Sequence, residues 1–326
     1  MEENKVLLEA QDLQQYFPVA GRRGKFVRAV DGVSFAIREG ETFGLVGESG
    51  CGKSTLARTV IRINKPTGGR IAFDGLEITN LSQKDLKGSG LRQRMQMVFQ
   101  DPYSSLNSRM TVRDALMEPL IANQIGENDA QREEMAREAL GRVNLSPDYI
   151  HRYPHEFSGG QRQRICIARA LIVKPQMVIC DEAISALDVS IQAQVVNMLG
   201  DFQQELGLTY LFIAHDLSMV RYVSHRVGVM YLGRLVELCE SEEIYSHPLH
   251  PYTQGLLRSV PVPDPKLARS RDKEALEGEV PSPIDPPKGC HFHPRCPYAK
   301  PVCREAVPPM TDAGSGHMVC CHLFSE

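Results

Sequence analysis

The stretch that decides the fold of this chain is Gly47-Glu48-Ser49-Gly50-Cys51-Gly52-Lys53-Ser54-Thr55. Its spacing, G-x-x-x-x-G-K-[ST], is that of a phosphate-binding loop. Residues 41–47 before it predict a short buried strand, and residues 53–63 after it predict a helix. The glycines allow a sharp turn that aims several backbone N–H groups at one anion, and the helix adds the positive end of its dipole. We expect Lys53 to meet the β- and γ-phosphates and the Ser54 hydroxyl to meet Mg²⁺.

A chance match of a glycine-rich loop is the alternative, and the strand–loop–helix context argues against it. The overall composition is that of a globular protein, with 326 residues, 42% of them hydrophobic, and a net charge of −3. This charge gives no indication of a nucleic-acid partner. The sequence contains no run of 18 apolar residues, so it predicts no transmembrane helix. Residues 1–5 lack the basic and apolar regions of a signal peptide, so we expect a cytoplasmic protein whose membrane role comes through a partner.

The chain changes character along its length. Residues 5–38 alternate apolar and β-branched residues with polar ones, which predicts an antiparallel β region. Residues 101–157 show helical periodicity and predict a mainly helical lobe. The apolar runs at 176–181 and 209–214 predict parallel strands buried on both faces. Together these patterns predict an α/β fold with a mostly parallel, mixed sheet, an antiparallel β region and a helical lobe.

Several of the predicted strands are followed by polar side chains. Gln100, the pair Asp181-Glu182 and His215 each follow such a strand. Ligands of open α/β sheets bind at the carboxyl ends of the strands, so we expect these groups around one nucleotide. Asp181 is the candidate for Mg²⁺, Glu182 for the general base, Gln100 for Mg²⁺ or the attacking water, and His215 for the γ-phosphate.

Two further motifs make the chain resemble the ATP-binding-cassette (ABC) ATPases over about residues 5–245. Phe157-Ser158-Gly159-Gly160-Gln161 is similar to the signature sequence of that family, and Ser185-Ala186-Leu187-Asp188 is similar to its D-loop. In the family, two cassettes pair head to tail, and the signature of one closes over the ATP held by the other. The resemblance therefore implies that Ser158, Gly159, Gly160 and Gln161 bind the nucleotide of a second ATPase subunit. It also matches Phe17 to an aromatic that stacks on adenine, whereas the sequence alone left a core aromatic equally open.

The end of the chain sharpens this resemblance. His250-Pro251-Tyr252-Thr253 and the run from Gly278 to Cys290 are similar to a C-terminal extension of bacterial oligopeptide and dipeptide importer ATPases. We therefore expect a cassette at 1–245 and a largely irregular extension at 246–326. The resemblance implies two transmembrane permease subunits, a second ATPase, expected to be a paralogue, and an external periplasmic substrate-binding protein. It places the chain peripherally at the cytoplasmic face of the bacterial inner membrane.

Five of the nine cysteines lie in the last 37 residues, which in a reducing compartment suggests a metal more than disulfides. Cys290, Cys296 and Cys303 with Cys320 or Cys321 could bind a four-iron cluster or zinc, or could be unligated thiols. The wide spacings favour iron–sulfur. Related importers carry similar cysteines that can bind a [4Fe-4S] cluster, and the stretch His317-x-Val319-x-Cys321 favours Cys321 as the fourth ligand.

Other functions remain as alternatives at this stage. A cassette protein that acts on DNA would need a long coiled coil, and a translation-linked protein would need a second cassette. An exporter would need a fused membrane domain. The sequence has none of these. A regulatory module would not need Glu182 and His215. An ABC importer for another small solute, such as nickel or a sugar, is the main competing function.

Overall fold

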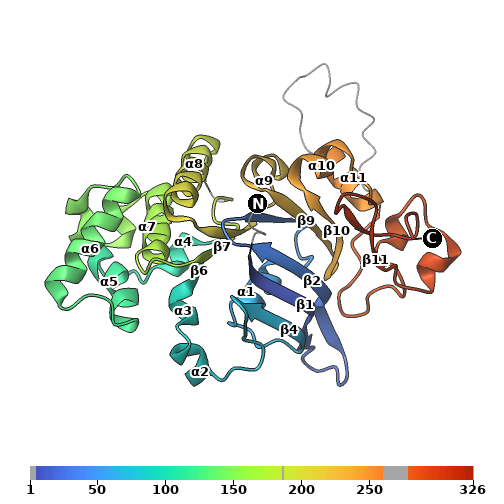
Figure 1. Ribbon diagram of the computed structural model, residues 1–326, viewed down its shortest axis with the longest axis horizontal. Helices are drawn as coiled ribbons and strands as arrows, with labels where there is room; N and C mark the ends of the chain where they lie inside the picture. The colour runs from blue at the N-terminus through green and yellow to red at the C-terminus, as the bar shows by residue number, and fades with distance from the viewer. Residues whose placement is uncertain (1–4, 186, 260–277, 326) are drawn as a thin grey trace, which may run out of the picture. The chain divides into compact units, whose positions relative to one another are not determined.

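The computed structural model describes residues 5–185, 187–259 and 278–325, which form two compact units. The first unit contains Lys5, Arg38–Glu41 and Leu81–Ile213. The second contains Val6–Ile37, Thr42–Asn80 and the described part of Ala214–Glu326. Figure 1 labels elements from both units, which are described separately below.

The first unit is mainly helical, with three strands. Its strands are β6 (Met95–Val98), β7 (Met177–Asp181) and β8 (Thr209–Ile213). Its α-helices are α2 (Gln83–Gly88), α3 (Leu91–Arg94), α4 (Pro102–Ser105), α5 (Val112–Ala122), α6 (Asp129–Arg142), α7 (Gly159–Leu171) and α8 (Val189–Leu206), and two 3₁₀ turns cover Pro147–His151 and Pro154–Glu156. Helices α5, α6 and α7 pack on one another, as Figure 1 shows in green to yellow-green.

The three strands of this unit run parallel in the order β8-β7-β6. The register pairs Val98 with Cys180, and Asp181 with Ile213, at the carboxyl ends of the strands. Every residue of β7 and β8 is buried, which is why these strands are apolar except for Thr209 at the start of β8 and Asp181 at the end of β7. The parallel strands predicted from the sequence are therefore confirmed.

Local capping explains where the helices of this unit begin. The Thr111 hydroxyl accepts from the Asp114 N–H at 3.2 Å, and the Asp114 carboxylate accepts from the Thr111 N–H, so that a capping box starts α5. The Asn128 side chain accepts from the Gln131 N–H at 2.9 Å at the start of α6. Helix α8 ends at Leu206, and the φ of 64° at the next residue, Gly207, suits the left-handed residue that closes a helix.

The second unit contains two sheets. The first is the four-stranded sheet β2-β1-β4-β5, and β1 pairs antiparallel with β4. This result confirms the predicted antiparallel β region. The strands of this sheet are β1 (Val6–Pro18), β2 (Phe26–Arg38), β4 (Gly68–Phe73) and β5 (Leu76–Glu77).

The second sheet of this unit has the order β11-β12-β10-β9-β3, in which only the β3–β9 pair is parallel. Its strands are β3 (Thr42–Val46), β9 (Arg226–Tyr231), β10 (Arg234–Glu240), β11 (Met310–Asp312) and β12 (Met318–Cys320). The unit also holds helices α1 (Lys53–Val60), α9 (Leu217–Val223), α10 (Ser241–Ser246) and α11 (Pro251–Arg258), and 3₁₀ turns at His293–Arg295 and Pro301–Arg304. Helix α1 is shorter than the predicted 53–63, because Arg62 takes a left-handed φ of 63°.

The C-terminal extension contains more regular structure than its proline content predicts. Strand β12 pairs with the edge of β10, where Glu237 lies opposite Val319. The side chain of Glu237 is fully buried, and its carboxylate accepts from the N–H groups of Leu249 at 2.7 Å and His250 at 2.9 Å. The same carboxylate lies 2.7 Å from Nε2 of His317. A buried carboxylate needs such partners, so Glu237 fixes two separate parts of the extension to β10.

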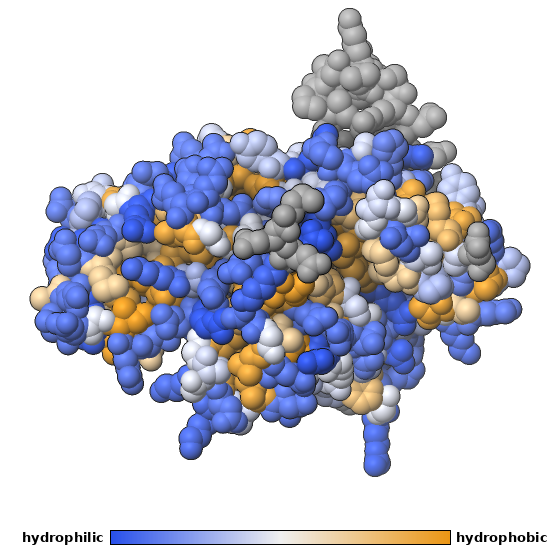
Figure 2. Space-filling model, viewed as in Figure 1, coloured by the Kyte–Doolittle hydropathy of each residue, from blue (hydrophilic) through white to orange (hydrophobic). Residues whose placement is uncertain are grey.

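Hydrophilic residues cover most of the face drawn in Figure 2, with smaller hydrophobic areas between them. Within the described ranges, none of the helices has both the length and the hydropathy that crossing a bilayer requires.

Candidate functional site

The phosphate-binding loop of the second unit joins β3 to α1, as the sequence predicts. Two of its glycines leave no room for a side chain. Gly47 has a φ of 149°, and a Cβ there would lie 2.1 Å from the carbonyl oxygen of Met230. Gly52 has a φ of 109°, and a Cβ there would lie 2.0 Å from the carbonyl oxygen of Ala29. Any substitution at these positions would therefore displace the loop.

Lys53 is buried at the start of α1 and points back into the loop. Its Nζ donates to the carbonyl oxygens of Gly47 at 2.7 Å and Glu48 at 3.1 Å. Ser49 and Gly50 at the tip of the loop are exposed, whereas the Cys51 thiol is buried, which raises its pKa. Ser54 and Thr55 are half-buried on the first turn of α1. The loop therefore holds the Lys53 ammonium group beside its own backbone, whose N–H groups can meet the same anion.

The first unit brings two of the predicted catalytic residues together. Asp181 ends β7 with 1% exposure, and Glu182 follows it with 5% exposure. Nε2 of Gln100 donates to Oε2 of Glu182 at 2.5 Å. Glu182 has a φ of 50°, and its N–H donates to the carbonyl of Ile213 at 2.9 Å. A left-handed backbone at a buried glutamate is strained, and such strain is concentrated at functional sites.

Two other predicted residues, both in the second unit, lie at its surface. Phe17 near the end of β1 is 37% exposed, as a ring that stacks on a base must be. His215 is exposed and directly precedes Asp216, the N-cap of α9. Neither residue is absorbed into a core.

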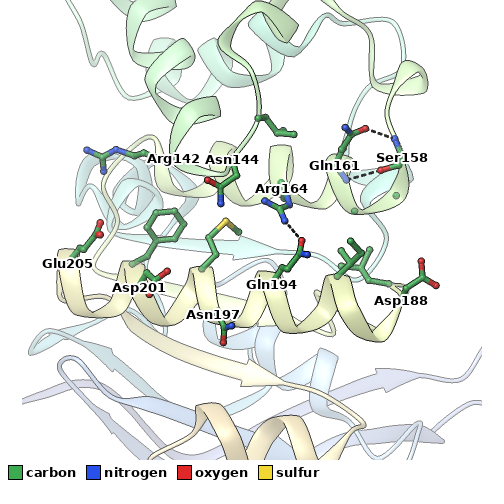
Figure 3. A pocket seen from close by; sticks show the side chains of 17 residues that line it. Arg142, Asn144, Ser158, Gln161, Arg164, Asp188, Gln194, Asn197, Asp201 and Glu205 are labelled. Atoms are coloured by element: carbon green, nitrogen blue, oxygen red, sulfur yellow. Dashed lines mark hydrogen bonds between the residues drawn. The ribbon is translucent and has the colours of Figure 1, made fainter.

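The signature stretch lies in the first unit, at the start of α7. The hydroxyl of Ser158 accepts from the N–H of Gln161 at 3.3 Å, and Oε1 of Gln161 accepts from the N–H of Ser158 at 3.0 Å (Figure 3). Ser158 is exposed, and Gly159 and Gly160 are half-buried. They border a cavity of about 1310 Å³ that continues along α8 from its N-cap Asp188, with Arg164 of α7 also in its wall. This helix start is open to an anion from outside the unit.

The C-terminal cysteines are arranged around Cys303. Burial is the main cause that raises the pKa of Cys290, Cys296 and Cys321, and the nearby Cys303 thiol raises each of them further. The Sγ of Cys320 instead donates to the carbonyl of Pro308 at 3.1 Å. Cys303 therefore lies near the other three cysteines favoured from the sequence, and Cys320 also lies near Cys290.

Zinc and a four-iron cluster require different separations of their cysteine sulfurs. Zinc bound by four thiolates at about 2.3 Å would hold the sulfurs about 3.8 Å apart. Among the described residues, no group of three or more His, Cys, Asp or Glu side chains is compact enough to hold one metal ion. A four-iron cube separates its cysteine sulfurs more widely, because iron and sulfide lie between them.

Comparison with known proteins identifies the family. A model described as "ABC transporter" matches residues 30–185, and one described as "Oligopeptide/dipeptide transporter, C-terminal region" matches residues 236–303. The oligopeptide transport ATP-binding protein AppF of Bacillus subtilis (strain 168) is 54% identical, over 98% of each chain. The chain belongs to the ATP-binding subunits of the oligopeptide/dipeptide ABC transporters.

Other relatives of this ABC subunit agree. The probable peptide ABC transporter ATP-binding protein y4tS of Sinorhizobium fredii is 51% identical, over 97% of this chain and 90% of that protein. A dimeric post-hydrolysis structure of the ATP-binding cassette MJ0796 bound to ADP and Pi matches with a TM-score of 0.66 and 25% identity, over 72% of this chain and 99% of that one. The predictions of an ABC nucleotide-binding fold, of an ATPase subunit and of the peptide-importer family are confirmed.

Sequence reasoning missed two residues of this ABC subunit that touch the phosphate-binding loop. Tyr252 and Arg295 come from the C-terminal extension and contact Glu48. No spacing in the sequence could indicate these contacts, because they join residues more than 200 positions apart. Within the D-loop stretch, Ala186 lies outside the described residues.

Proposed function

We propose that this chain binds Mg-ATP on its phosphate-binding loop and hydrolyses it to drive the import of oligopeptides or dipeptides. Lys53 and the loop N–H groups of residues 47–55 hold the β- and γ-phosphates, while Phe17 stacks on the adenine. Ser54, Asp181 and Gln100 supply oxygen ligands for Mg²⁺, directly or through water. The contact that carries this proposal is the Gln100–Glu182 hydrogen bond, because it ties a buried carboxylate to a side chain that can orient water.

In the reaction, Glu182 takes a proton from the water that attacks the γ-phosphate, and His215 contacts the γ-phosphate. Catalysis here consists mainly of positioning and charge stabilisation, since the phosphoryl group passes through a loose transition state. The strained backbone at Glu182 supports this role, because it holds the carboxylate in one direction.

A second cassette completes the site in this proposal. Ser158, Gly159, Gly160 and Gln161 form an anion cradle at a helix start that is open to solvent. We propose that this cradle closes over the ATP of a partner ATPase. In this proposal the partner is a paralogue, and the two subunits form a heterodimer. The dimeric state named for the MJ0796 cassette supports pairing of this kind.

The cassette at 1–245 and the extension at 246–326 remain our proposed division of the chain. We propose that the helical lobe at about 101–157 meets two permease subunits at the cytoplasmic face of the inner membrane. A periplasmic binding protein would deliver peptide to those permeases, so its link to this chain is indirect. The names of the relatives support a peptide cargo.

We also propose a [4Fe-4S] cluster on Cys290, Cys296, Cys303 and Cys321, with zinc as the alternative. The proximity of Cys303 to Cys290, Cys296 and Cys321 supports the ligand set. When bound, the cluster would supply a covalent cross-link within the extension, because its four cysteines must deprotonate and converge.

The decisive experiment is uptake by the reconstituted complex. The chain, its co-purifying ATPase and permeases are placed in vesicles with ATP and the binding protein, and labelled peptide, nickel and sugar are compared. We expect ATP-dependent uptake of peptide that Lys53→Ala abolishes. Uptake of nickel or sugar without peptide would refute the cargo, and uptake that survives Lys53→Ala would refute the mechanism.

A further inference from the structure

The C-terminal extension forms hydrogen bonds with Glu48 of the phosphate-binding loop. The backbone N–H of Glu48 donates to the Tyr252 hydroxyl at 2.8 Å. The guanidinium of Arg295 donates twice to the Glu48 carboxylate, from Nη1 to Oε2 at 2.8 Å and from Nη2 to Oε1 at 3.1 Å. Paired bonds of this kind between arginine and a carboxylate are strong and fix the geometry of both groups.

Both extension residues are held firmly in place. The Tyr252 ring is fully buried and packs against Tyr231, with ring centroids 4.6 Å apart, and against Phe292 at 5.5 Å. Arg295 ends the 3₁₀ turn that follows Phe292, and its side chain is only 5% exposed. A side chain that is packed in this way loses little further freedom when it makes its hydrogen bonds.

The charge of Glu48 matters because of where it lies. Its side chain is 27% exposed and belongs to the loop that must receive a triphosphate. Its carbonyl oxygen also accepts from Nζ of Lys53. A bare carboxylate at this position would repel the phosphates and compete for Lys53, whereas the Arg295 guanidinium neutralises it and holds it in a fixed direction.

We propose that Arg295 and Tyr252 are positioning residues for the nucleotide, through which the C-terminal extension sets the affinity of the phosphate-binding loop. Arg295 cancels the charge of Glu48, and Tyr252 fixes the loop backbone at the same residue. Neither residue touches the nucleotide itself. The proposal rests on the proposed ATP binding, and it gives the extension a role in the site that residues 47–55 alone do not show.

The test measures Mg-ATP binding to the full chain by titration calorimetry. We expect Arg295→Ala to weaken binding about tenfold, in the range found for couplings between contacting residues. Adding Glu48→Gln to Arg295→Ala should restore most of the lost affinity, since it removes the uncompensated charge. Tyr252→Phe should weaken binding about threefold by leaving the Glu48 N–H without its acceptor.

The matched control is Lys25→Ala. Lys25 also ties the extension to the rest of the unit, through an ion pair of 2.6 Å with Asp285, but both side chains are largely exposed and neither touches the loop. This variant should bind Mg-ATP as the parent does. A general loosening of the extension would affect both variants, whereas the proposal predicts a loss for Arg295→Ala alone.

Three results would overturn the inference. The first is that Arg295→Ala binds Mg-ATP as tightly as the parent. The second is that Arg295→Ala loses affinity and the added Glu48→Gln does not restore it, which would mean that Arg295 has a purely structural role. The third applies if Arg295→Ala yields too little folded chain: Tyr252→Phe then binds Mg-ATP as tightly as the parent. Lys53→Ala separates the two hypotheses: if it abolishes binding while Arg295→Ala does not weaken it, the inference fails and the proposed function stands. A parent chain that binds no Mg-ATP overturns both.

Discussion

Glu182→Gln should separate ATP binding from ATP hydrolysis in this subunit. The Glu182 side chain is 5% exposed and accepts a hydrogen bond from Gln100. A glutamine amide oxygen can accept the same bond, so the pocket keeps its shape and the affinity for ATP is retained. What is lost is a base for the attacking water. Such a base contributes about 10²–10⁴-fold, equivalent to about 3–5 kcal/mol of the barrier.

We expect the upper end of this range, because Glu182 is buried. Bulk water therefore has little access to the site and cannot easily act as the base in place of the missing carboxylate. The assay is phosphate release by the complex assembled with its second ATPase and permeases, together with the amount of ATP that stays bound. The control is Glu134→Gln, the same substitution at an exposed position of α6. Turnover of the variant at the parental rate, or loss of ATP binding with it, would refute the assignment of Glu182 as general base.

Three further predictions concern other parts of the chain. Lys53→Ala should abolish measurable Mg-ATP binding by calorimetry, because the ammonium at the loop is lost; retained binding would contradict the phosphate-loop assignment. Cys321→Ser should remove the iron content and visible absorption of the purified chain. Cys320→Ser should retain both, since that thiol bonds to a backbone carbonyl. The reverse result would make Cys320, and not Cys321, the fourth ligand. Burial lowers the pKa of His250 to about 4, so the unfolded chain takes up a proton below its usual value of 6.5 while the folded chain does not. His250 should therefore lower the free energy of unfolding by about 2 kcal/mol between pH 7 and pH 5. His291, whose pKa burial also lowers to about 4, should add a similar fall. His250→Asn, which can keep the helix cap, should remove about half of this dependence in urea titrations, and an unchanged slope would contradict the contribution of His250.

The two motifs with the most chemistry were readable from the sequence for a local reason. The phosphate-binding loop requires glycines at 47 and 52, because a side chain there would meet the backbone carbonyls of Met230 and Ala29. The capping box of Ser158 and Gln161 joins residues three positions apart. Interactions of this range are written into the spacing of the residues, so a single sequence was enough to predict the strand, the loop and the helix starts.

The buried strands were predictable for a similar reason. A parallel strand that is covered on both faces is largely apolar, as β7 and β8 are apart from Asp181 and Thr209 at their ends. The polar residues that follow such strands, Asp181 and His215 among them, were therefore expected at the edge where ligands bind. The Gln100–Glu182 bond fits that expectation within the first unit.

Only the tertiary structure decided what the C-terminal extension does. Its prolines predicted an irregular segment, yet β12 pairs with β10 because the edge of β10 was available and Glu237 lies there to fix the extension. The contact of Arg295 with Glu48 spans more than 240 residues, and nothing in either neighbourhood specifies the other. Short-range spacing determines turns, caps and buried strands, whereas the partner of a distant side chain depends on which edges and faces the folded core leaves open.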